Sequence, residues 1–187
     1  SRRSDLPRGV LKYYYDMLAK DVDVVGSNLR EYFAVTRNTD GTVDVAMYDA
    51  TKTQQKGSEL LYSRKFNPGE TREIRLFGMG GKDVFDLSGE SKRSIKIRII
   101  GGPGADVIND RSKVGGSGKG TQVYEHSPKG EIALGEEGKR AYSVNESAYD
   151  YDRTAYAYNS YLPLPYIAYN SDDGFLAAEA RMATGAK

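Results

Sequence analysis

A pattern that repeats after 23 residues constrains the fold of this chain more than any other feature of its sequence. The stretch EIRLFGMGGKDVFDL, residues 73–87, aligns with KIRIIGGPGADVIND, residues 96–110, and six of the fifteen positions are identical. The identical pairs are Ile74/Ile97, Arg75/Arg98, Gly78/Gly101, Gly81/Gly104, Asp83/Asp106 and Val84/Val107. In each copy a strand-like run leads into a glycine-rich turn, an aspartate and a second short strand, which indicates one repeated supersecondary unit.

A period of this length is typical of one rung of a β-solenoid. If the two copies stack in register, their strands lie about 4.8 Å apart and Ile74 stacks on Ile97 in an inward-facing apolar ladder. Arg75 and Arg98 then point outward on the solvent face. Stacking alone usually requires three or more copies, so neighbouring hairpins must cover the ends of the pair.

The same stacking places Asp83 and Asp106 in equivalent turns on adjacent copies. Two carboxylates about 5 Å apart repel each other by about 3 kcal/mol at an effective dielectric constant of about 20. A Ca²⁺ ion that bridges the turns would offset this repulsion, with backbone carbonyls as further ligands. Residues 101–109 fit the calcium-binding pattern G-G-x-G-x-D-x-U-x, whereas the first copy has Met79 at its second glycine position. The alternative is that each aspartate accepts hydrogen bonds from backbone N–H groups of its own turn.

Ahead of the repeat, the sequence predicts a helix, a short strand and two hairpins. The helix spans residues 4–20, where an apolar stripe follows a capping Ser or Asp and a Pro in the first turn. The strand is expected at residues 21–26. The hairpins are expected at residues 31–49, around an Asp-Gly turn, and at residues 60–77, around a Pro-Gly pair.

Behind the repeat, residues 141–170 carry eight tyrosines and two prolines and lack clean periodicity until YIAY at residues 166–169. We interpret them as a linker or extended arm whose tyrosines pack on this domain or on a neighbouring one. Residues 175–182 then alternate between an apolar and a mostly polar face. This alternation suits a strand of a membrane β-barrel, and equally an amphipathic edge strand or a short helix.

These patterns predict a mainly β fold, made of hairpins plus two stacked β-solenoid-like Gly-Asp rungs, with one N-terminal helix. We expect three segments along the chain. They are an N-terminal helix and short strand at residues 1–26, a β domain with the 23-residue repeat at residues 27–140, and a Tyr-rich arm with a truncated barrel-like strand at residues 141–187.

Composition excludes several classes of function. The chain has 187 residues, a net charge of +1 and no cysteine, so nothing indicates nucleic-acid binding, thiol catalysis or a cysteine-zinc site. The single histidine, His126, lies in a polar turn-like setting, and we expect it on the surface. Residues 111–121 are rich in glycine but lack the spacing of a phosphate-binding loop. The sequence therefore predicts no catalytic residue and no organic cofactor.

Three stretches resemble parts of large surface proteins of Gram-negative bacteria: residues 70–89, 98–110 and 161–182. Those proteins carry a calcineurin-like metallophosphoesterase domain near the start and an outer-membrane β-barrel at the end. The resemblance covers about Asp5 to Met182 and implies that this chain is the segment between the enzyme and the barrel. Because the chain has one histidine and lacks the D-x-H, G-D and G-N-H metal motifs, no catalytic residue carries over.

The function expected from these observations is a non-catalytic spacer or interaction domain of an outer-membrane-associated protein. Its expected partners are the phosphoesterase and β-barrel domains of the same polypeptide, on the periplasmic or surface side of the outer membrane. The alternative is a calcium-stabilised glycan- or peptide-binding module, with Asp83 and Asp106 as the candidate Ca²⁺ ligands. An independent hydrolase is a third hypothesis. The chain begins with Ser1 rather than Met, so we expect a fragment or a processed product.

Overall fold

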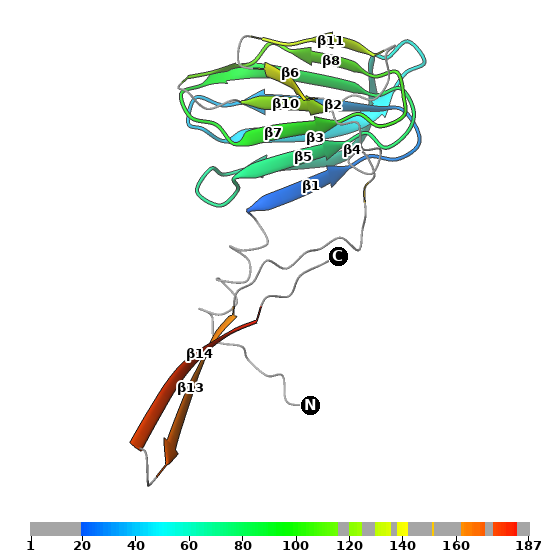
Figure 1. Ribbon diagram of the computed structural model, residues 1–187. Coiled ribbons are helices and arrows are strands. Elements are labelled where there is room, and N and C mark those ends of the chain that lie inside the picture. The colour runs from blue at the N-terminus through cyan, green and yellow to red at the C-terminus, as the bar shows by residue number, and fades with distance from the viewer. Residues whose placement is uncertain are drawn as a thin grey trace, which may run out of the picture. The chain divides into compact units, whose positions relative to one another are not determined.

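The computed structural model describes residues 20–115, 120–124, 130–135, 138–141, 151, 162–170 and 174–182. Regular structure in these residues is β-strand, which confirms the predicted mainly β fold (Figure 1). The helix predicted at residues 4–20 lies outside the described residues except for its last position. The described part of the chain holds no apolar helix long enough to cross a bilayer. Two compact units are distinguished, with the division after Tyr151.

In the first unit, five described strands form what we call the parallel sheet. Their order is β1 (Asp21–Val25), β5 (Glu73–Phe77), β7 (Lys96–Ile100), β10 (Thr121–Tyr124) and β12 (Gly138–Ala141). Every neighbouring pair in this sheet is parallel. Parallel neighbours need crossover connections, and from β1 to β10 these run through strands of the other sheet.

The other strands of this unit form what we call the mixed sheet. Its order is β11 (Glu131–Ala133), β8 (Val107–Asp110), β6 (Val84–Ser91), β2 (Glu31–Arg37), β3 (Val43–Ala50) and β4 (Lys56–Phe66), and β9 (Lys113–Val114) also pairs with β6. The four strands from β11 to β2 are parallel, whereas β2, β3 and β4 are antiparallel. The β2–β3 pair confirms the hairpin predicted at residues 31–49, and Gly41 supplies a positive φ of 91° in its turn.

The two copies of the repeat are hydrogen-bonded to each other in both sheets, and the paired residues are the same number of positions apart in each sheet. Ile74 lies opposite Ile97 in the parallel sheet, and Val84 lies opposite Val107 in the mixed sheet. Both pairs are 23 residues apart, as the sequence alignment requires. Because a slip of one residue would turn every side chain to the opposite face, the apolar pattern of the repeat specifies this register strongly.

Strands β1 and β2, which precede the repeat in the sequence, also pair with one common offset in both sheets. Asp21 lies opposite Glu73 and Tyr32 opposite Val84, and both pairs are 52 residues apart. Strands β1 and β2 thus pair with β5 and β6 at one common offset, and the β3–β4 hairpin lies between β2 and β5 in the sequence.

The core lies between the two sheets, which face each other in Figure 1. The parallel sheet contributes Ile74, Leu76, Ile97, Ile99 and Val123, and the mixed sheet contributes Phe33, Val35, Phe85, Leu87 and Ile108, all at most 1% exposed. The rings of Phe33 and Phe85 stack with centroids 4.6 Å apart. Each such side chain contributes about 1.5–3 kcal/mol on burial, so this double apolar ladder is the main stabilising element of the fold.

The prediction of a hairpin at residues 60–77 is wrong. Strand β4 pairs with β3, whereas β5 pairs with β1 and β7 in the other sheet. The Pro68-Gly69 turn is present, since the Thr71 N–H donates to the Asn67 carbonyl at 2.9 Å, but it carries the chain from one sheet to the other. A turn signal marks where the chain reverses, and the core-facing Ile74 and Leu76 decide where β5 pairs.

The second unit contains a two-stranded hairpin, β13 (Leu162–Asn170) and β14 (Gly174–Met182). The pairing is antiparallel from Leu162 opposite Met182 to Asn170 opposite Gly174. Of the structures that the alternation of residues 175–182 suited, the structure shows a strand, β14, whereas β13 lies in residues interpreted as a linker or extended arm. Pro163 and Pro165 are two residues apart, so their missing N–H groups fall on one edge of β13, and a strand tolerates both when that edge is unpaired.

Candidate functional site

Three buried carboxyl side chains occupy equivalent turns between the two sheets. Glu31, Asp83 and Asp106 are 3%, 0% and 1% exposed, and together they are called the acid ladder below. Each carboxyl residue stands at or directly before the start of a mixed-sheet strand. The structure therefore brings the two sequence-predicted residues into adjacent turns and adds Glu31 to them.

A sequence signal for Glu31 was present but weak. Gly26 precedes Glu31 by five residues, and the same spacing separates Gly78 from Asp83. The N–H of Gly26 donates to the Phe77 carbonyl at 2.8 Å, just as the N–H of Gly78 donates to the Ile100 carbonyl at 2.9 Å. The 52-residue spacing and the change from Asp to Glu hide this correspondence from a search at a period of 23.

The aspartates hydrogen-bond to the backbone of neighbouring turns. Asp83 Oδ1 accepts the N–H of Glu31 at 2.9 Å, and Asp106 Oδ1 accepts the N–H of Asp83 at 2.9 Å. The alternative to a calcium bridge that the sequence left open placed such bonds within a single turn, and the structure corrects this detail. Because a buried N–H without a partner costs about 1–3 kcal/mol, each aspartate stabilises the stacking of one turn on the next.

Glycines make room for the buried carboxyl groups. A Cβ atom on Gly78 would lie 2.6 Å from Asp83 Oδ2, and one on Gly104 would lie 2.8 Å from Asp106 Oδ1 and 2.1 Å from the Gly81 carbonyl oxygen. This explains why glycine and aspartate recur in phase in the repeat. Met79, which replaces a glycine of the second copy, adopts a positive φ of 70° and so carries local strain.

A bound proton reduces the charge of the acid ladder. Burial raises the pKa of Asp83 to about 9 against the lowering effect of the Glu31 N–H bond, and the charges of Asp106 and Glu31 raise it further. A pKa raised this far favours the protonated form of Asp83 at neutral pH. Asp83 Oδ2 and Glu31 Oε2 are both buried without a hydrogen-bond partner among the described residues. A proton on Asp83 offsets the carboxylate repulsion for which a Ca²⁺ ion was considered.

The arrangement offers few further ligands for a metal ion. Among the described residues, no group of three or more His, Asp or Glu side chains is placed to hold a metal. A Ca²⁺ ion at Asp83 and Asp106 would draw its remaining oxygen ligands from backbone carbonyls, as the sequence interpretation supposed. His126 lies outside the described residues.

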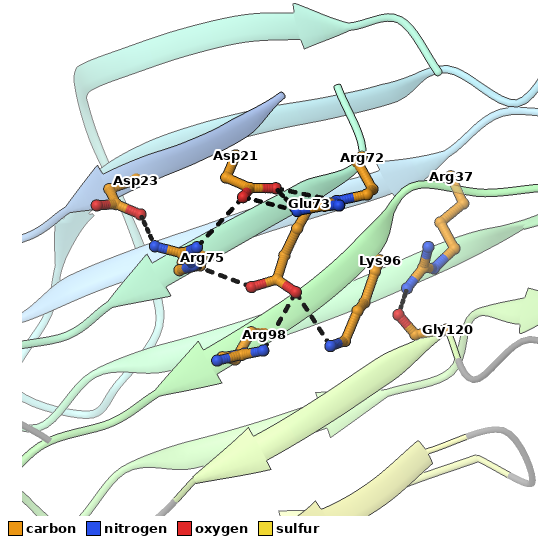
Figure 2. Close-up of polar contacts among 9 residues, drawn as sticks. All are labelled: Asp21, Asp23, Arg37, Arg72, Glu73, Arg75, Lys96, Arg98 and Gly120. Atoms are coloured by element: carbon orange, nitrogen blue, oxygen red, sulfur yellow. Dashed lines mark hydrogen bonds and ion pairs between the residues drawn. The ribbon is translucent and has the colours of Figure 1, made fainter. Parts of the chain in front are cut away.

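The outer face of the parallel sheet carries a network of ion pairs (Figure 2). Glu73 lies at its centre and accepts contacts from Arg75 at 2.9 Å, Lys96 at 3.0 Å and Arg98 at 3.2 Å. Burial favours a higher pKa for Glu73, but the hydrogen bonds from Arg75 and Lys96 outweigh it, so its pKa is lowered. The side chains of Arg75 and Arg98 are about a third exposed, which confirms that they point outward.

A buried arginine at the end of β2 hydrogen-bonds to the segments that contain Ser112 and Gly120. Arg37 is 1% exposed, and its Nη2 donates to the Gly120 carbonyl at 2.8 Å (Figure 2). Its Nε donates to Ser112 Oγ at 3.1 Å, and Ser112 Oγ donates in turn to Asp110 Oδ1 at 2.6 Å. This chain of hydrogen bonds links the buried cation to a buried carboxylate, which identifies Arg37 as a structural residue.

The outer face of the mixed sheet bears a groove of about 640 Å³, called the sheet groove below. The β3–β4 loop forms part of its wall, and strands β2, β6, β8 and β11 form its floor. The lining residues are Tyr32, Thr53, Gln54, Gln55, Lys56, Val84, Asp86, Val107, Asn109, Arg111 and Glu131. Sequence reasoning missed this site because its residues come from separate strands and one loop, and only the pairing of the strands unites them.

Asp86 organises the polar side of the sheet groove. Its Oδ2 accepts the Tyr32 hydroxyl at 2.9 Å, and its Oδ1 accepts Arg111 Nη2 at 2.7 Å. Burial and the hydrogen bond to Asp86 raise the pKa of Tyr32 to about 12, so the phenol stays protonated. The groove thus presents an ordered array of hydrogen-bonding groups beside the apolar side chains of Val84 and Val107.

Comparison of the chain with protein-family models, curated proteins and solved structures finds no match.

Proposed function

We propose that this chain is a non-catalytic spacer and interaction module of a larger outer-membrane-associated protein. The proposal includes stacked β-solenoid-like rungs as the body of the module, supported by the common offset of the two repeat copies in both sheets. Its place beside a membrane barrel rests on one observation, the β13–β14 hairpin. Each of its strands has nine residues, close to the 9–11 residues of a strand that crosses an outer membrane.

Fractionation of cells that express the full-length parent gene tests this proposal. The module should sediment with the outer membrane and stay there in high salt, since a barrel of the same polypeptide would anchor it. Release of the intact polypeptide into the soluble fraction by salt alone contradicts the proposal. A second readout is phosphatase activity, which deletion of residues 20–151 from the parent protein should leave measurable.

A second candidate function is ligand binding, with a glycan or a peptide as the ligand and calcium as a stabiliser. The sheet groove favours ligand binding, and the pair Asp83 and Asp106 is the candidate calcium site. A Ca²⁺ ion bound only to the folded chain would raise the melting temperature by mass action. Asp106→Asn would abolish that increment.

The raised pKa of Asp83 predicts a different result for calcium. A pKa of about 9 favours protonated Asp83 at neutral pH, and Asp83 Oδ1 and Asp106 Oδ1 already accept backbone hydrogen bonds. Millimolar Ca²⁺ should then leave the melting temperature unchanged, with Mg²⁺ as the matched control. A rise specific to Ca²⁺ that Asp106→Asn removes would establish the calcium-stabilised module instead.

A further inference from the structure

We propose that the sheet groove binds a neutral oligosaccharide. The inference rests on the second candidate function, ligand binding, and assigns to it a site and a ligand class. The floor of the groove is a face of parallel strands in register, where side chains from successive strands recur about every 4.8 Å. One row runs from Tyr32 through Val84 and Val107 to Glu131, and the next contains Asp86 and Asn109.

The two rows have complementary chemistry for a sugar chain. The first row offers the aromatic ring of Tyr32 and the half-buried side chain of Val107, which suit the apolar C–H face of a sugar ring, whereas Val84 between them is buried. The second row offers a carboxylate and an amide, which suit hydroxyl groups as donors and acceptors. Asp86 is held by Tyr32 and Arg111, so its orientation is set before a ligand arrives.

Gln54 supplies an independent observation at the wall of the groove. Its Nε2 atom is buried and has no hydrogen-bond partner in the described structure, although the residue lines the groove. Its backbone φ of 57° is one that glycine adopts more readily. A strained loop residue that holds an unsatisfied amide at the wall of a groove is explained when a ligand oxygen accepts from that amide.

Charge and backbone geometry favour a neutral saccharide over a peptide or a polyanion. Two acidic residues, Asp86 and Glu131, face two basic residues, Lys56 and Arg111, so the groove carries no charge excess. An extended peptide gains affinity mainly by adding a strand to a sheet edge. The floor of this groove is a sheet face, where backbone groups bond within the sheet and only side chains are offered to a ligand.

Isothermal titration of the full chain with a panel of neutral oligosaccharides tests the proposal. The probes are four- to six-unit chains of β-1,4-glucose, β-1,4-N-acetylglucosamine, β-1,4-mannose and α-1,4-glucose. They are chosen as chains of repeating units because the strands of the floor repeat about every 5 Å. We expect at least one to bind. Asn109→Ala should weaken that binding about five- to tenfold, whereas Gln122→Ala, on the outer face of the parallel sheet, should not change it.

Gln54→Gly separates binding from folding. The change removes both the positive-φ strain and the unsatisfied amide, so the melting temperature should stay the same or rise while saccharide binding weakens. Equal binding by Gln54→Gly and wild type, or loss of binding in Gln122→Ala, would overturn the assignment of the site. If no neutral probe binds at millimolar concentration, the saccharide proposal is wrong. If an extended peptide library binds in an Asn109-dependent way instead, the ligand-binding function stands and the ligand class is wrong.

Discussion

At the scale of single residues, glycines and carboxyl groups in the turns depend on each other. Gly78 and Gly104 leave the space that the buried side chains of Asp83 and Asp106 occupy. The aspartates in turn accept backbone N–H groups that the close stacking removes from water. The repeat conserves both residue types between its copies because neither works in this turn without the other.

Gly104→Ala should destabilise the chain by about 1–3 kcal/mol, because the added Cβ would lie 2.1 Å from a backbone oxygen that cannot move without shifting the next turn. Gly69→Ala is the matched control, since its Cβ would meet only Asn67 Oδ1 at 3.5 Å. Urea denaturation followed by circular dichroism measures both. Equal stability of the two variants would show that the turns are not packed as described.

Asp83 predicts a pH dependence of stability. Its folded pKa of about 9 lies above the ordinary value of 3.8, so the folded chain holds a proton that the unfolded chain has released. The contribution of Asp83 to the free energy of unfolding should therefore be largest below about pH 4. This contribution should fall as the pH rises to about 9. Asp83→Asn keeps an acceptor for the Glu31 N–H and should remove most of this decline. Denaturation curves at pH 6 and pH 9.5 measure this decline in the free energy of unfolding. An equal decline in Asp83→Asn and wild type would contradict the raised pKa of Asp83.

At the scale of elements, the repeated unit could be predicted from the sequence where local pattern and pairing coincide. The register of Ile74 on Ile97 follows from the identical spacing of glycine and aspartate in the two copies. The β4–β5 hairpin was predicted wrongly because a Pro-Gly turn says nothing about the partner of the next strand. The sheet groove could not be predicted, since Gln54 and Asn109 meet only through the topology of the mixed sheet.

The apolar ladders predict a sharp contrast between two leucines. Leu76 is fully buried on β5, so Leu76→Ala should lower the free energy of unfolding by about 2–5 kcal/mol. Leu60 on β4 is 54% exposed, and Leu60→Ala should change it by no more than about 0.5 kcal/mol. Thermal and chemical denaturation of the two variants would contradict the two-sheet core if Leu60→Ala proved the more damaging.

At the scale of the whole molecule, the first unit combines a mainly apolar core between its sheets with two different outer faces. The parallel sheet presents the ion-pair network around Glu73, and the mixed sheet presents the sheet groove. Tyr151, a described residue of the Tyr-rich stretch, packs on the parallel face, since its ring lies 5.0 Å from that of Phe77 between centroids. This contact supports, for Tyr151, the expectation that tyrosines of the arm pack on the domain.

Disulfide formation reports whether the two repeat copies stack in register, because the chain contains no cysteine of its own. Residues opposite each other on parallel strands lie about 4.8 Å apart, within the span of a disulfide, whereas a diagonal pair lies about 8 Å apart and beyond it. The double variant Arg75→Cys/Arg98→Cys should therefore oxidise to an intramolecular disulfide, since these residues are opposite in β5 and β7. The control Arg75→Cys/Lys96→Cys should stay reduced, because Lys96 lies opposite Glu73. Faster oxidation of the control pair, measured by thiol labelling under mild oxidant, would contradict the register and the stacked arrangement built on it.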